Sequence, residues 1–209
     1  MNIKKFLKNT ALYSVLTCFS TLSTFGISFD FTDPKNVNNA QFLLDAPLEQ
    51  ISGFANGVSG NINFDPANPE NISGIINISS DSVTVGNPMM LDHLKGSKWL
   101  DVSTHKNIAF EAESLSNLKN VGQALVADVT GTFTMKGIAK KITVPVEFMF
   151  LKDKLGARMG KNDLKGDLLV VRSDFSVNRS DFNIMAGKKE DKVSNKIEVS
   201  LRVVGASSK

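Results

Sequence analysis

The feature that most constrains the fold is an alternation of apolar and polar side chains with a period of two residues. In residues 126–136 the apolar side chains fall mostly on odd positions, whereas in residues 138–150 they fall mostly on even positions. A period of two is that of a β-strand with one buried and one exposed face. The two runs therefore predict neighbouring strands, each with one face turned toward a core.

The change of parity between the two runs predicts a two-residue turn at Lys136 and Gly137. In such a hairpin Met135 pairs with Ile138, and both side chains point to the same face. Gly137 supplies the positive φ that the turn needs, so Gly137→Val should cost about 1 kcal/mol or more of stability. Register and hydrophobic pattern thus agree on an antiparallel hairpin.

Further segments carry the same alternation, which gives roughly eight strands in all. Their apolar positions are Phe42 and Leu44; Ile62 and Phe64; Ile76 and Ile78; Ile108 and Phe110; Leu169, Val171, Phe175 and Val177; and Ile197, Val199, Leu201 and Val203. Helical patterning is confined to residues 89–100 and part of 152–163, too little for βαβ crossovers. The sequence therefore predicts an all-β fold, an antiparallel barrel or sandwich.

The N-terminal segment has the layout of a secretory signal peptide. Basic residues in positions 1–9 precede a largely uncharged stretch that ends in small residues. We expect residues 1–28 to be the leader, with an approximate cleavage point, and residues 29–209 to form one barrel domain. An uncleaved anchor is the weaker alternative, because the uncharged stretch is short and rich in Ser and Thr. The layout predicts a secreted, periplasmic protein.

The basic charge of the chain belongs to the leader. The chain has 24 Lys and Arg against 21 Asp and Glu, and Lys4, Lys5 and Lys8 account for the excess, so nothing supports a nucleic-acid partner. The single cysteine, Cys18, also lies in the leader. The mature domain should therefore contain no disulfide and depend on its core. A lipoprotein signal at Cys18 is the alternative, with Thr17 unfavourable just before it.

Residues 86–110, GNPMMLDHLKGSKWLDVSTHKNIAF, predict a short polar helix between two strands. Their order of Asn, Asp, His-Leu, a basic residue, an aromatic, Leu-Asp and a later Ile-x-Phe resembles the YceI-like, polyisoprenoid-binding family of lipocalin-like barrels. Other blocks agree in order and spacing: SGFANGVSGNINFDPANP, IINISSDSVTVGNPMMLDHL, DVTGTFTMKGIAKKITVPVEF, and VNRSDFNI followed by SNKIEVSLRVVG. The chain departs from the pattern at Asn38, Asn39 and Ala46, where many members carry histidines.

The resemblance implies a lipocalin-like barrel with a short helical lid and an elongated apolar ligand inside. Burial of about a dozen prenyl carbons at ~0.8 kcal/mol each would contribute roughly 10 kcal/mol before ordering costs. Strand parity and the lid then give these cavity-facing candidates: Phe42, Leu44, Phe64, Ile76, Ile78, Met89, Met90, Leu94, Trp99, Phe110, Ala127, Val129, Phe133, Met135, Val146, Phe148, Phe175 and Leu201.

Whether such a barrel is open or filled is not decided by the sequence, because eight strands suit either a packed interior or one ligand. Small residues on the apolar face, namely Gly74, Ala112, Ala127 and Gly131, favour some open volume. The phenylalanines on that face suit a plain core equally well.

The sequence predicts no catalytic residue, no metal and no cofactor. The chain has two histidines, His93 and His105, too few for a typical zinc or haem site. We expect His93 to cap or pin the lid helix and His105 to be solvated. A GxSxG motif is absent. Arg179 and Asp181 are expected to stabilise the barrel end through a local charge-assisted hydrogen bond, with a ligand head-group contact as the alternative.

We therefore expect a barrel that binds, stores or transports a long apolar or amphiphilic lipid. The resemblance implies an isoprenoid or quinone-like chain, and fatty acids or their amides are equally compatible. The alternative is a structural or stress-response interaction protein with a filled barrel and no ligand. An enzyme is a third class, for which no reactive group can be identified. Transient membrane contact is compatible with this function, and the oligomeric state stays open, with a homodimer among the options.

Overall fold

The computed structural model describes residues 26–208 of the chain. The predicted leader, with Cys18, lies outside the described residues except for its last three positions. Two short α-helices are present in the described part, α1 (Pro88–Lys95) and α2 (Leu155–Met159), with 3-10 turns η1 (Pro69–Asn71), η2 (Ser80–Ser82) and η3 (Arg179–Phe182). The strands are β1 (Ile27–Asp30), β2 (Asn39–Asp45), β3 (Gln50–Ala55), β4 (Val58–Phe64), β5 (Ser73–Ser79), β6 (Val83–Val85), β7 (Asn107–Val121), β8 (Ala124–Met135), β9 (Ile138–Leu151), β10 (Gly166–Asn178) and β11 (Lys196–Ser208).

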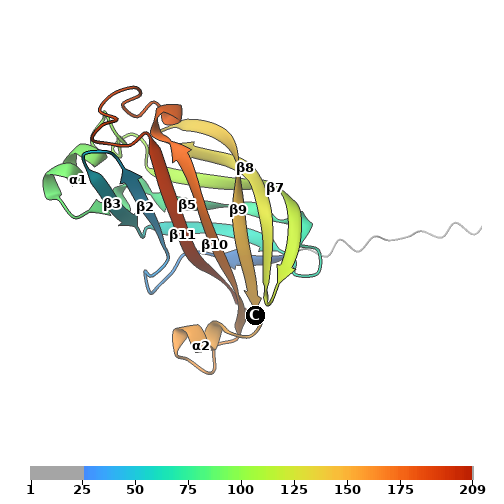
Figure 1. The fold of residues 1–209 in the computed structure, drawn as a ribbon. Helices are drawn as coiled ribbons and strands as arrows, with labels where there is room; N and C mark the ends of the chain where they lie inside the picture. Colours follow the sequence, from blue (N-terminus) through green and yellow to red (C-terminus); the bar gives the residue numbers. More distant parts are fainter. Residues whose placement is uncertain (1–25, 209) are drawn as a thin grey trace, which may run out of the picture.

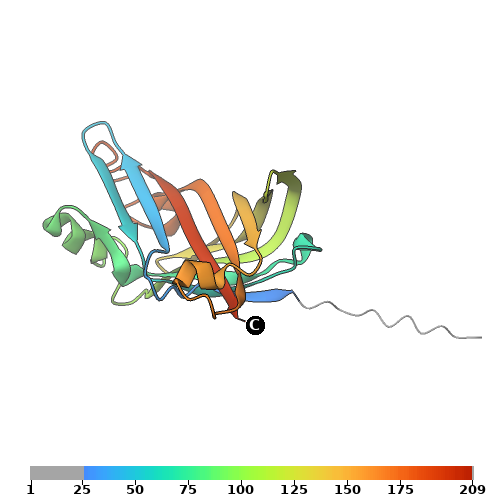
Figure 2. The same cartoon turned by 90° about the horizontal axis from the view of Figure 1, so that it is seen from below.

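The strands form one antiparallel sheet that closes on itself (Figure 1, and from below in Figure 2). Strands β4, β5, β7, β8, β9, β10 and β11 follow one another around the wall, and β1 closes the ring between β11 and β4. This ring has eight strands, which confirms the predicted all-β antiparallel barrel. No helix among residues 26–208 has the length and apolar character needed to cross a bilayer.

One position in the wall is shared by two strands. Strand β2 pairs with residues 198–202 of β11, whereas Asp30 of β1 pairs with Ala206 farther along the same strand. Strand β4 follows β3 directly in the chain, and β6 follows β5. The earlier strand of the first pair, β3, pairs with β6, and the later one, β4, pairs with β5. Strand β6 pairs with β3 and ends the sheet on that side, so the ring of eight closes through β1. The sequence pattern counts β2 among the eight, whereas it predicts no strand at β1, the first half of which falls in the expected leader.

A buried asparagine joins the two strands that share this position. Asn38 is 2% exposed, and its Nδ2 donates to the carbonyls of Phe31 and Val204 at 3.0 Å each. Its Oδ1 accepts from the backbone N–H of Val204 at 2.9 Å. The side chain thus satisfies backbone groups of β11 between the end of β1 and the start of β2.

The end of the barrel near β1, here called the base, is filled by aromatic side chains. Phe29 and Phe31 are both fully buried, and the rings of Phe64 and Phe148 stack with centroids 5.7 Å apart. The opposite end, here called the mouth, carries α1, η3 and the β2–β3 turn (Figure 1). The packed aromatic side chains therefore close one end of the barrel and not the other.

The predicted hairpin between β8 and β9 is confirmed. Met135 pairs with Ile138, and both turn residues have positive φ, 50° at Lys136 and 73° at Gly137. His105 is half-buried against this turn, so the prediction that it is solvated was wrong. A Cβ added at Gly137 would lie 2.6 Å from Cε1 of His105. Sequence parity located the turn but not the loop that packs on it.

Candidate functional site

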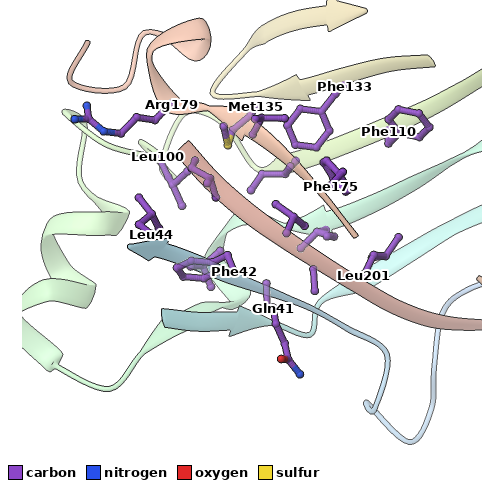
Figure 3. A pocket seen from close by; sticks show the side chains of 18 of the residues that line it. Gln41, Phe42, Leu44, Leu100, Phe110, Phe133, Met135, Phe175, Arg179 and Leu201 are labelled. Atoms are coloured by element: carbon purple, nitrogen blue, oxygen red, sulfur yellow. The ribbon is translucent and has the colours of Figure 1, made fainter. Parts of the chain in front are cut away.

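A largely apolar cavity of about 660 Å³ lies inside the barrel (Figure 3). Its wall is formed mainly by inward-facing residues of β2, β5 and β7 to β11, and by residues of α1 and of the chain after it. Ligand sites in proteins commonly have volumes of roughly 300–1,000 Å³. Side chains therefore fill the base of this barrel but leave a space of ligand size above it.

All the cavity-facing candidates except Phe64 and Ala127 line this cavity. These two are buried in the packed base instead. Parity of a strand residue gives the face of the sheet but not the height along the barrel, which explains the two exceptions. The candidates that line the cavity are Phe42, Leu44, Ile76, Ile78, Met89, Met90, Leu94, Trp99, Phe110, Val129, Phe133, Met135, Val146, Phe148, Phe175 and Leu201.

Phe133 organises the aromatic part of the wall. Its ring meets Phe175 edge to face at 6.0 Å between centroids, and Phe182 at 5.5 Å. Phe110 lies opposite Phe133 in the β7–β8 ladder, and Figure 3 shows Phe110, Phe133 and Phe175 along one side of the cavity. Edge-to-face contacts fix ring orientation, so this part of the wall is preformed.

Two of the four predicted small residues line the cavity, and the others do not. Gly74 and Ala112 face each other across β5 and β7 and belong to the lining. Gly131 lies opposite Ala112, where an added Cβ would lie 2.8 Å from Cζ of Phe110. The carbonyl oxygen of Glu111 would lie still closer to that Cβ, at 2.2 Å, so Gly131 makes room for the backbone of β7 and for the Phe110 ring. Of the four small residues, Gly74 and Ala112 therefore contribute open volume to the cavity, as predicted.

The exposed members of the lining mark the mouth and come from three segments. Glu49 belongs to the β2–β3 turn, and Asn87, Met89 and His93 to α1 and its cap. Gln41 is also exposed, but it lies near the start of β2 and its side chain points away from the interior (Figure 3). Lys189 and Lys192 belong to residues 183–195, here called the strap, which connects η3 to β11. Met89 is 70% exposed, as suits a flexible side chain at an entrance.

Helix α1 is capped by Asn87 and not by His93. The Asn87 side chain accepts the backbone N–H of Met90 at 3.1 Å, and Pro88 occupies the first turn. The His93 side chain is exposed at the mouth, which corrects its predicted capping role. The Asn-Pro pair is a recognised start signal and would have placed the cap. The helix is also shorter than the predicted segment 89–100.

Arg179 is the polar centre of the mouth. The residue is 0% exposed and lines the cavity, and its guanidinium carbon lies 5.9 Å from the Trp99 ring centroid. Figure 3 shows its guanidinium directed away from the apolar side chains of the interior. Its N–H groups donate to strap carbonyls at 2.5–3.1 Å, those of Ile184, Met185, Lys188, Val193 and Ser194.

All five N–H donors of this guanidinium are therefore used within the protein. Asp181, the expected partner, is exposed, and the bonds of Arg179 go to backbone carbonyls instead. Burial lowers the pKa of Arg179, and the nearby Glu190 carboxylate opposes that change. Arginine nevertheless stays charged in proteins. Arg179 shapes the strap and places a positive charge at the mouth, without a free donor for a ligand.

The depth of the cavity offers little chemistry. Ser173 is a buried polar residue of the lining, and its hydroxyl donates to the carbonyl of Pro145 at 2.7 Å. Among residues 26–208, no group of three or more His, Cys, Asp or Glu side chains is placed to hold a metal ion. The cavity is therefore suited to apolar contact.

The YceI-like domain model matches residues 23–205 of the chain. The UPF0312 protein of Pseudomonas fluorescens strain Pf-5 is 28% identical over 162 residues, which covers 76% of each chain. The UPF0312 protein of Ectopseudomonas mendocina is 30% identical over 99 residues, which is 47% of this chain and 50% of that protein.

Solved structures show the same fold. Burkholderia cenocepacia BcnA superposes with a TM-score of 0.64 at 22% identity, covering 80% of this chain and 95% of BcnA. A polyisoprenoid binding domain from Saccharophagus degradans, implicated in plant cell wall breakdown, gives a TM-score of 0.62 at 12% identity, covering 88% and 99% of the two chains.

Proposed function

Because the chain belongs to the YceI-like family, we propose that its barrel binds a long apolar or amphiphilic lipid and stores or transports it. The observation that carries the proposal is the apolar cavity of about 660 Å³ above a packed base. A lipid chain in the cavity would exchange water for aliphatic and aromatic contacts, at about 0.8 kcal/mol for each buried CH₂ group. The polar groups gathered at the mouth suit an amphiphile with its head outward.

An isoprenoid chain is the first candidate ligand. Support comes from the Saccharophagus degradans neighbour, which is named a polyisoprenoid binding domain. A fatty acid or its amide fits the same apolar lining. We place the protein among binding proteins rather than enzymes, since the buried Ser173 hydroxyl is engaged by a carbonyl and the cavity histidine, His93, lies exposed at the mouth.

We also propose export to the periplasm, on the basis of the leader-like residues 1–28. A carrier of membrane lipids would meet a bilayer transiently when it loads or unloads. The exposed Met89 at the mouth is suited to such contact. The leader-like sequence supports export, and the proposed ligand class supports transient contact with a bilayer.

The test is native mass spectrometry of the protein isolated from its own host, followed by organic extraction and identification of bound species. We expect a stoichiometric long-chain lipid. Ala112→Phe, which fills the cavity, should reduce the bound lipid, whereas Ala139→Phe on the exposed face of β9 should not. An empty protein that takes up neither isoprenoids nor fatty acids would favour the interaction-protein alternative.

A further inference from the structure

We propose that the lipid in the cavity carries an anionic head group, a carboxylate or a phosphate, that binds Lys189 and Lys192 at the mouth. The inference rests on the proposed function, because it specifies the head of the lipid whose chain the cavity would hold. Neither the apolar lining nor the fold determines the charge of that head. The charged side chains at the mouth do.

Basic residues outnumber acidic residues among the charged side chains that line the cavity. Arg179, Lys189 and Lys192 are basic, and Glu49 is the acidic member. Within residues 26–208 no ion pair involves Lys189 or Lys192. Both ammonium groups are thus available to a ligand. An anionic head cannot enter the apolar depth without a large desolvation penalty, so it would remain beside them.

The strap holds these two lysines in a defined turn. The carbonyl of Lys189 accepts the N–H groups of Lys192 and Val193 at 3.1 and 2.7 Å. Arg179 binds the carbonyls of Lys188 and Val193, on the two sides of the turn. The backbone that carries the two ammonium groups is therefore fixed, while their long side chains can adjust to the head group.

The β2–β3 turn holds the strap from the other side. The N–H of Leu48 donates to the carbonyl of Asp191 at 3.0 Å. Glu49 follows Leu48 and therefore lies on the turn that meets the strap. Its carboxylate would repel an anionic head, so it reduces the selectivity that the two lysines create. Glu190 and Asp191 are exposed in the strap and do not belong to the lining.

Arg179 contributes charge without direct contact. Its donors are all used by strap carbonyls, as described above, so it acts as a positioning residue. Its positive charge at the edge of an apolar cavity still favours an anion nearby, because charges interact strongly where the surroundings are poorly polarisable. A neutral amide or alcohol would gain nothing from this field.

The experiment compares lipids of identical chain and different head. Delipidated full-length mature protein is titrated at pH 8 with oleic acid, oleamide and oleyl alcohol, and separately with farnesyl phosphate and farnesol. Trp99, the single tryptophan of the chain, lines the cavity and reports binding by fluorescence. We expect the acid or the phosphate to bind about tenfold more tightly than its neutral partner, as one charge-assisted contact would give.

The double variant Lys189→Gln, Lys192→Gln should remove most of this preference, measured as the ratio of the affinities for oleic acid and oleamide, and leave only the part that the charge of Arg179 contributes. The control Lys188→Gln alters a strap lysine that does not line the cavity and should keep the preference. Glu49→Gln should increase the affinity for the anionic lipid. A preference for carboxylate over phosphate, or the reverse, identifies the head and supports the proposal in either case.

Equal affinity for charged and neutral heads in the unmodified protein, or a preference that the double variant does not reduce, would overturn the binding of an anionic head group by Lys189 and Lys192 and leave lipid binding intact. Failure of every one of these lipids to bind would overturn the proposed function itself. The two failures are therefore distinguishable in one set of titrations.

Discussion

The base and the mouth of the barrel each depend on a buried polar side chain, and the two differ in kind. At the base, Asn38 both donates and accepts, and it completes the edge of β11 where β1 and β2 leave it free. At the mouth, Arg179 only donates, and it gathers five carbonyls of a loop that has no strand partner. At the sheet edge, one neutral amide side chain is enough, because it can both donate to and accept from the free backbone groups. The irregular loop presents several carbonyls at once, and these are satisfied by the five N–H donors of a guanidinium.

The difference predicts that the mouth is more sensitive to a single substitution than the base. Arg179→Met should lower the free energy of unfolding by at least about 3 kcal/mol, because several buried carbonyls lose their donor at roughly 1–3 kcal/mol each. Urea denaturation measures this directly. The control Arg172→Met removes an exposed arginine that pairs with Glu147 and should change stability by less than about 1 kcal/mol. Equal losses in both variants would contradict a special role for Arg179.

Asn38→Leu tests the base with a similar but smaller expected effect. The loss should be about 2 kcal/mol, because the side chain's bonds to Phe31 and Val204 disappear from a buried site. Asn63→Leu, at an exposed position of β4, should have little effect. Amide hydrogen exchange then shows which end of the barrel loses protection in the Asn38 variant. The Asn38 variant should expose amides of β1 and β2 and leave the strap protected, and the reverse pattern would refute the assignment.

The turns at the two ends separate backbone strain from side-chain contact. Gly137 and Gly122 both have positive φ, but only Gly137 has a neighbour, His105, within reach of an added Cβ. We expect Gly137→Val to cost about 1 kcal/mol or more and Gly122→Val to cost less. His105→Ala should reduce the difference in a thermal melt. If Gly122→Val is the more damaging change, the contact with His105 is unimportant.

The smallest expected effect is a dependence of the base on pH. Burial acts to raise the pKa of Asp33, but the backbone N–H groups of Val37, Lys35 and Asn38, and the charge of Arg158, outweigh it and lower the pKa below 3.8. A lowered pKa in the folded protein stabilises it at pH values above 3.8, and this contribution is lost as the pH falls through the folded-state value.

The stability difference between the unmodified protein and Asp33→Asn should therefore shrink on acidification. Chemical denaturation at neutral pH and below pH 3.8 measures it. Arg179 does not titrate in this range, so the mouth should not contribute to the change. A constant difference across this range would mean that the Asp33 charge does not support the base.

Period-two patterning was sufficient for the eight strands of seven residues or more, the β8–β9 turn and most of the cavity wall, because a buried face leaves its mark at every second residue. It missed the shorter strands β1, β3 and β6. It could not place Phe64 and Ala127, whose height along the barrel depends on strand stagger. It could not find the partners of Arg179 either, because backbone carbonyls have no residue identity. Asn38 also gave no sequence signal for a side chain that takes the place of a strand.

The wall position shared by β1 and β2 gives the two ends of the barrel separate mechanics. Strand β1 pairs with β4 and β11 near the base, while β2 pairs with β3 and β11 near the mouth. Detaching β2 from β11 would break no pair made by β1. The ladder that holds the mouth and the ladder that holds the base are therefore separate, so a change of pairing at one end does not require a change at the other.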